Sequence, residues 1–200
     1  VEAYLILLED GVELEEAFAQ STALPYDLEI EAGLSFAEFG YNNPTHPHSW
    51  AWIDRPVVIA RLLGSDGMRG VGARLGWRAP LPWHSRIHLG VMNATNEVAT
   101  SFGGEGEEPG APTVGGRQFT PVDVQSPADL AWLVRWENAF DVTDAVVAKA
   151  GASFMAGPNA TGPDGETRVS GVDLAVKWHP PGEPEGFPFV TVEAEMLKRD

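Results

Sequence analysis

Apolar and polar residues alternate along most of the chain with a period of two. In segment 26–39 the even-numbered positions up to Phe36 are apolar and most odd-numbered ones are polar or small. Segment 128–140 repeats this pattern with one interruption, and 171–178 and 189–196 alternate in the same way. Side chains of a β-strand point alternately to its two faces. Because helical periodicity is nearly absent, the pattern predicts an all-β protein whose strands have one apolar and one polar face.

Nine strands are predicted, at 2–8, 12–21, 26–39, 71–79, 84–94, 128–140, 145–156, 168–178 and 187–197. Several reach ten residues or more, whereas strands of globular proteins usually have about five or six. Strands that cross a membrane need about nine to eleven residues. We therefore expect an antiparallel meander that forms part of a transmembrane, outer-membrane β-barrel. The alternative is a soluble β-sandwich or meander, since a solvated sheet face also carries alternating charges.

The predicted connections differ in length between the two ends of the sheet. The long loops 40–70 and 95–127 share one rim with 157–167, and shorter turns occupy the opposite rim. Outer-membrane barrels have long extracellular loops and short periplasmic turns, with aromatic girdles where the barrel meets the membrane surface. The short-turn rim is rich in aromatic residues: Tyr26, Trp77, Trp83, Phe140, Trp178, Phe187 and Phe189.

Composition excludes several classes of function. The net charge of -16 argues against a nucleic-acid partner, because phosphates would be repelled. The absence of cysteine excludes disulfides and thiolate chemistry. No nucleophile or metalloprotease motif appears, and no pair of carboxylates stands out as acid and base. We therefore predict that the protein is not an enzyme.

Residues 38–77 carry a distinctive string. It consists of Glu38-Phe39-Gly40, Asn43, His46-Pro47-His48, Trp50, Asp54, Pro56, Arg61, Gly64, Asp66-Gly67, Arg69-Gly70, Gly72 and Trp77. In these positions the chain resembles a family of Gram-negative outer-membrane β-barrel proteins of porin type, some members of which are labelled zinc-regulated and TonB-dependent-receptor-like. The resemblance implies an outer-membrane location and a transport or porin role. The odd number of strands and the non-aromatic last residue, Asp200, predict a single barrel segment over 1–200 that belongs to a larger barrel.

The polar face of such a barrel lines its lumen, where facing charges set the preference for ions and solutes. The predicted lining residues are Arg74, Arg78, Arg135, Lys149, Lys177, Glu29, Glu31, Asp173, Glu193 and Glu195. Segment 55–63 is a candidate short helix in a loop that either folds into the lumen or stays outside. If it folds inward, the residues near the constriction are Asp54, Arg55, Arg61, Asp66 and Arg69.

His46 and His48 are two residues apart, so on an extended segment they point the same way, and Asp54 completes a reasonable zinc set. The alternative is that these residues pack the loop through ordinary hydrogen bonds, and we favour it, with zinc as the minority hypothesis. No other cofactor is expected.

The sequence thus predicts a porin-like barrel that gives passage to small polar solutes or ions. Its expected partners are the lipid bilayer of the outer membrane and those solutes, and homo-oligomerisation stays open. The alternative function is a soluble β-rich module that binds a ligand or a metal.

Overall fold

A computed structural model describes most of the chain. The described residues are 2–8, 11–21, 23–46, 49–50, 53–96, 98–104, 113–114, 117–118, 120–181 and 188–200. In this part of the chain no helix is long and apolar enough to cross a membrane.

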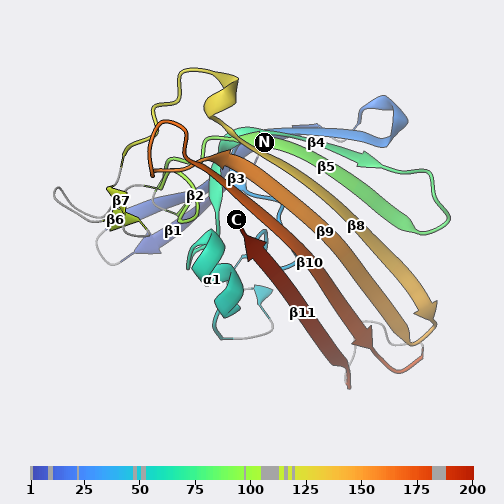
Figure 1. The fold of residues 1–200 in the computed structure, drawn as a ribbon. Helices are drawn as coiled ribbons and strands as arrows, with labels where there is room; N and C mark the ends of the chain where they lie inside the picture. The colour runs from blue at the N-terminus through green and yellow to red at the C-terminus, as the bar shows by residue number, and fades with distance from the viewer. Residues whose placement is uncertain are drawn as a thin grey trace.

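Nine strands form one antiparallel sheet, and each strand pairs with the next one along the chain (Figure 1). They are β1 (Glu2–Leu8), β2 (Gly11–Ser21), β3 (Leu28–Phe36), β4 (Arg69–Arg78), β5 (His84–Met92), β8 (Ala131–Thr143), β9 (Val146–Pro158), β10 (Glu166–Trp178) and β11 (Val190–Arg199). Two short strands, β6 (Thr113–Val114) and β7 (Arg117–Gln118), pair with each other between β5 and β8. Over the described residues the sheet is not closed, since β1 and β11 are its two edges. The predicted all-β antiparallel meander is confirmed.

The strand boundaries differ from the prediction by up to three residues, and two strands start late because short turns of 3-10 helix precede them. Before β3 the turn η1 (Pro25–Asp27) holds Tyr26 at φ 64°, in the left-handed region, so the extended strand begins only at Leu28. Before β8 the turn η3 (Pro127–Asp129) is stabilised by a capping box in which Ser126 and Asp129 bond to each other's backbone. Both turns contain a proline, which fixes φ near the helical value.

The period of two gives the sheet two unlike faces. We call the outer face the one that carries the exposed apolar side chains of β3, β4, β5 and β8–β11. Its largest exposed members include Ile30, Val71, Leu75, Leu89, Trp132, Val134, Trp136, Phe154, Val172, Leu174, Val192 and Met196. We call the opposite side the inner face; it carries Glu31, Arg74, Arg135 and Asp173. Strand registers place these sets on opposite sides, for example Leu174 opposite Ala150 and Ala194, and Asp173 opposite Gly151 and Glu195.

The inner face is partly covered by the segment 37–68, which connects β3 to β4 and contains the helix α1 (Val57–Leu63). Phe39, Ile59, Leu63 and Met68 are fully buried, and they form one apolar cluster with inward residues of the sheet: Met92, Leu133, Met155 and Val169. The sheet curls beside α1 in Figure 1. The predicted alternatives for this loop were a position inside the lumen of a barrel and an external one; the structure shows the loop packed against the polar face of the open sheet.

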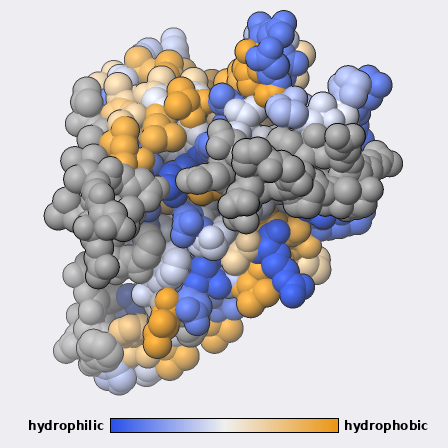
Figure 2. All heavy atoms as spheres, turned by 90° about the vertical axis from the view of Figure 1, so that its left-hand side faces the viewer, coloured by the Kyte–Doolittle hydropathy of each residue, from blue (hydrophilic) through white to orange (hydrophobic). Residues whose placement is uncertain are grey.

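The long connections lie at one end of the sheet, as predicted. This end holds the segments 37–68, 93–130 and 159–165, whereas the opposite end holds the connections 79–83, 144–145 and 179–189. Figure 2 views the molecule from the side of the long connections and shows hydrophilic residues between apolar groups at the upper left and in the lower part. Six aromatic residues predicted for the short-turn rim are exposed there, and Phe187 lies outside the described residues.

Candidate functional site

The inner face between segment 37–68 and the short-turn rim is polar, and a buried ion pair lies at its centre. The Arg135 guanidinium donates from Nη1 to Asp173 Oδ2 at 2.7 Å and from Nη2 to Asp173 Oδ1 at 3.1 Å. The two side chains come from β8 and β10, one strand apart, and Gly151 of β9 lies between them. A Cβ on Gly151 would stand 2.6 Å from the Asp173 carboxylate, so only glycine leaves room for the pair. Such a planar, bidentate pair of hydrogen bonds fixes the orientation of both side chains.

A second, half-buried cation lies on β4. Arg74 Nη2 is 2.7 Å from Glu31 Oε2, and Nη1 of the same guanidinium bonds Glu38. Glu31 faces Arg74 across the β3–β4 ladder, so the strand register makes this pair. Glu38 comes from the first turn of segment 37–68. Arg74 therefore ties the sheet to the segment that covers it.

A third group surrounds Glu137 on β8. His88 Nε2 lies 3.3 Å from Glu137 Oε1, and His84 Nε2 lies 4.0 Å from the same oxygen. Arg86, between the two histidines, lies 3.9 Å from Glu29. The sequence prediction named Glu29 and missed His84, Arg86, His88, Glu38 and Glu137. The signal was present for β5, because its alternation places 84, 86 and 88 on the polar face.

Segment 37–68 is held against the sheet by polar contacts as well as by its apolar core. Glu195 of β11 accepts from the Tyr41 backbone N–H at 3.2 Å and from Asn42 Nδ2 at 3.1 Å. Fully buried Asn43 donates from Nδ2 to the carbonyls of Ala37 and Met68, and its Oδ1 accepts from the Met68 N–H at 2.9 Å. The amide of Asn43 therefore closes the base of the segment, since it joins both ends.

His46, one of the two histidines of the predicted zinc set, has two glutamates as partners. His46 Nδ1 lies 3.1 Å from Glu15 and Nε2 lies 2.9 Å from Glu16, so one carboxylate stands at each ring nitrogen. A β-bulge at Glu15 shifts the β1–β2 register, which directs two consecutive glutamates to the same side of β2. The ring also packs against Tyr4 and Phe36. This arrangement is a bridge between segment 37–68 and β2.

Asp54, the carboxylate of that set, is exposed and lines a separate hollow with Asn42 and Glu193. His46 and Asp54 therefore do not form a common ligand set. Among the residues that the structure describes, no group of three His, Asp or Glu side chains has the arrangement of a metal site. His48 lies outside the described residues, so zinc binding stays a prediction.

The other constriction candidates divide into buried and exposed side chains. Arg55 is buried, donates to the carbonyls of Asn43 and Asp66, and lies over the Trp50 ring at 4.8 Å. Burial lowers the pKa of this guanidinium. Arg69 is buried beside Phe36, 5.9 Å from its ring centroid. Arg61 and Asp66 are exposed. Two of the five candidates thus pack the segment.

The remaining predicted lining residues lie toward the short-turn rim. Arg78 is exposed and faces Arg86 across the ladder. Lys149 lies 5.6 Å from the Tyr41 ring centroid, and Lys177 lies 5.3 Å from that of Phe189. Burial and the carboxylates of Glu193 and Asp173 raise the pKa of the Tyr41 phenol. All ten predicted residues are on the polar side of the alternation, but only some are open to solvent.

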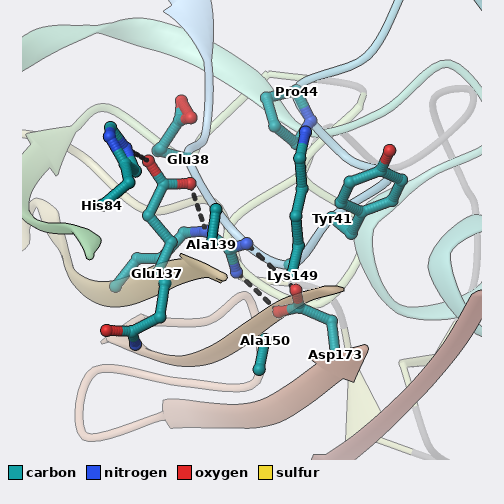
Figure 3. A pocket seen from close by; sticks show the side chains of 12 residues that line it. Glu38, Tyr41, Pro44, His84, Glu137, Ala139, Lys149, Ala150 and Asp173 are labelled. Carbon is teal, nitrogen blue, oxygen red and sulfur yellow. Dashed lines mark hydrogen bonds and ion pairs between the residues drawn. The ribbon is translucent and has the colours of Figure 1, made fainter. Parts of the chain in front are cut away.

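Two cavities open on this part of the inner face and share Tyr41 and Lys149. The first, of about 230 Å³, is bordered by Glu38, His84, Arg135, Glu137 and Asp173. Figure 3 shows the Lys149 side chain extending toward Pro44, with the Tyr41 ring beside it. The second, of about 350 Å³, lies between residues 41–50 and strands β9–β11. Chemically, the arrangement offers paired charges beside open cavity space.

Comparisons with known proteins give one relative of unknown role. An uncharacterised protein of Aquifex aeolicus (strain VF5) is 37% identical over 98 residues, which are 49% of this chain and 20% of that protein. The chain thus matches about a fifth of the length of this relative. No family model matches the chain, and no solved structure is similar to it.

Proposed function

We propose that this chain forms part of the wall of an outer-membrane β-barrel that gives passage to small polar solutes or ions. One observation carries the proposal: large apolar side chains of the outer face are exposed, whereas charged side chains at the centre of the inner face are buried. Trp132 is 54% exposed and Leu174 47%, whereas Arg135 is 3% and Asp173 6%. Large exposed apolar patches mark contact with a membrane or another protein. A lipid-facing exterior and a charged lumen require this distribution.

Strand length and the aromatic residues add support. Strands β8, β9 and β10 each have thirteen residues, more than enough to cross a bilayer at a tilt. Trp77, Trp83, Phe140 and Trp178 are exposed at the short-turn rim, where interfacial rings are favoured. In this proposal the inward segment 37–68 narrows the lumen, with Arg135, Asp173 and Lys149 on the remaining passage. Closure of the barrel needs partners for the edges β1 and β11, from further strands or a second copy.

The test is conductance of the full-length protein in planar bilayers. We expect discrete channel steps, and a larger step in Phe39→Ala, because the loss of this buried ring loosens segment 37–68. Lys198→Met, on the exposed side of β11, is the control and should leave the step size unchanged. A protein that extracts into buffer without detergent, or that gives no channel steps, would refute the proposal.

The cavity of about 350 Å³ favours a second candidate, a soluble module that binds a small ligand. It has the size of small-molecule sites, which are concave and contain a few polar groups. Extraction separates the two candidates, since the soluble module needs no detergent.

A further inference from the structure

The second cavity differs in charge from the rest of the molecule. Among the described residues that border it are Lys149, Lys177 and one carboxylate, Glu193. The whole chain has a net charge of -16, so this part of the lining, with more cations than carboxylates, is unusual in it. His179 also borders this cavity; its Nδ1 lies 3.0 Å from the Pro180 carbonyl, which can only accept, so the proton is on Nδ1.

The same cavity is bordered by aromatic rings, and each ring has a cation over it. Lys149 lies over Tyr41 at 5.6 Å, Lys177 over Phe189 at 5.3 Å, and the guanidinium of Arg55 over Trp50 at 4.8 Å. These distances are within the range of cation–π attraction, which orients the cations beside the rings. The cavity thus offers positive charge and apolar ring surface side by side.

Hydrogen-bond donors complete the lining. Tyr41 contributes a phenol, and Thr191 contributes a hydroxyl on β11. A tyrosine phenol is protonated at neutral pH and can donate to an anion, and burial raises the pKa of Tyr41 further. The volume of about 350 Å³ is in the range of small-molecule sites.

From this lining we infer that the second cavity binds small organic anions with an apolar or aromatic body, of the class of aromatic carboxylates. The carboxylate would contact the Lys149 and Lys177 ammonium groups and the Tyr41 hydroxyl, and the body would lie against the Trp50 and Phe189 rings. Neighbouring space does not suit such a ligand. The hollow beside Asp54 is bordered by three carboxylates, those of Asp54, Glu193 and Glu195, with no cation among its lining residues.

This inference rests on the proposed function, because it treats the inner face as the lining of a passage, and it adds a class of ligand for that face. The experiment is a titration of the full-length protein in detergent with benzoate, benzyl alcohol and benzylamine, followed by ligand-observed NMR. These probes share a ring and differ in charge. We expect saturable binding of benzoate, weaker binding of benzyl alcohol and none of benzylamine.

Variants test the assignment of residues. The double variant Lys149→Met with Lys177→Met should weaken benzoate binding at least tenfold, and Lys149→Arg with Lys177→Arg should retain it. Lys198→Met removes the same kind of side chain from β11 outside the cavity and should change nothing. Equal binding of benzylamine, or unchanged benzoate binding in the double Met variant with its thermal unfolding intact, would overturn the inference. If the double Met variant fails to fold, competition between benzoate and benzylamine on the unmodified protein decides.

Conductance of the same preparation separates the two proposals. Channel steps without benzoate binding would overturn the anion site and leave the passage standing. Benzoate binding without channel steps would overturn the passage and leave the anion site as that of a binding module.

Discussion

The outer and inner faces of the sheet are made by the same strands. Their exposure is the reverse of that in most globular proteins, because apolar side chains are exposed on one face and charged side chains are buried on the other. Val172 and Leu174 of β10 are about half exposed, whereas Asp173 between them is buried in an ion pair with Arg135. In a soluble sheet the apolar side would be packed against another layer and the charges would face water. Here segment 37–68 covers the charged side. Alternation alone shows that the sheet has an apolar and a polar face. The position of the covering segment shows which of the two faces is packed against protein and which is left exposed.

The inner face should be the more sensitive of the two. Arg135→Met leaves the buried Asp173 carboxylate without its cation, and removal of one partner of a buried pair costs about 3–5 kcal/mol. We expect a loss of this order in the free energy of unfolding, measured by urea titration of protein folded into lipid vesicles. Combining it with Asp173→Leu should recover most of the loss. If the single variant is as stable as the unmodified protein, the inner face is not a buried polar network.

A charge introduced on the outer face tests whether this face contacts lipid or water. If the outer face contacts lipid as proposed, Leu174→Arg should cost about 2–4 kcal/mol in vesicles, because a cation near the middle of a lipid-facing strand is poorly solvated. Val142→Arg, an exposed site near the short-turn rim, is the matched control and should cost about 0–1 kcal/mol. On a water-exposed face both changes would be within about 0.5 kcal/mol of neutral. Equal and small effects would therefore remove the distinction between the faces.

Asn43 tests the attachment of the covering segment. Asn43→Ala removes three buried hydrogen bonds to Ala37 and Met68, and each buried group left without a partner costs about 1–3 kcal/mol. We expect the segment to open before the sheet unfolds, seen as faster hydrogen exchange in 55–68 and unchanged exchange in β9 and β10. Asn159→Ala, in the connection between β9 and β10, is the control. Uniform acceleration across the sheet would show that the segment is not a separate layer.

The smallest effect concerns pH. The folded pKa of Tyr41 is raised above its unfolded value, so the phenol stabilises the fold fully below the ordinary tyrosine range. This stabilisation is lost as pH rises through the raised pKa. Ultraviolet absorbance should show one of the three tyrosines ionising at higher pH than the others, and Tyr41→Phe should remove that phase. If the ionisation phase at higher pH persists in Tyr41→Phe, a tyrosine other than Tyr41 has the raised pKa.

The strands could be predicted from the sequence because alternation is a local signal. All nine long strands lie within a few residues of their predicted positions. The packing of segment 37–68 against the polar face could not be decided, because Ile59 and Leu63 predict only a short amphipathic helix and Phe39 is far from them in the sequence. The partners of His46 were missed for a different reason: a β-bulge makes Glu15 and Glu16 share one side, against the alternation. Ion pairs such as Arg135–Asp173 depend on register across three strands.

The most direct test of the central claim is spin-label accessibility along β10. This chain has no cysteine, so a single cysteine introduced at Val172, Leu174 or Ala175 is the one cysteine within these 200 residues, and it is labelled in the protein in lipid vesicles. We predict that labels at Val172 and Leu174 collide with oxygen and are shielded from a water-soluble nickel complex, with the opposite preference at Ala175. Free access of the nickel complex to both outer-face labels would contradict the account.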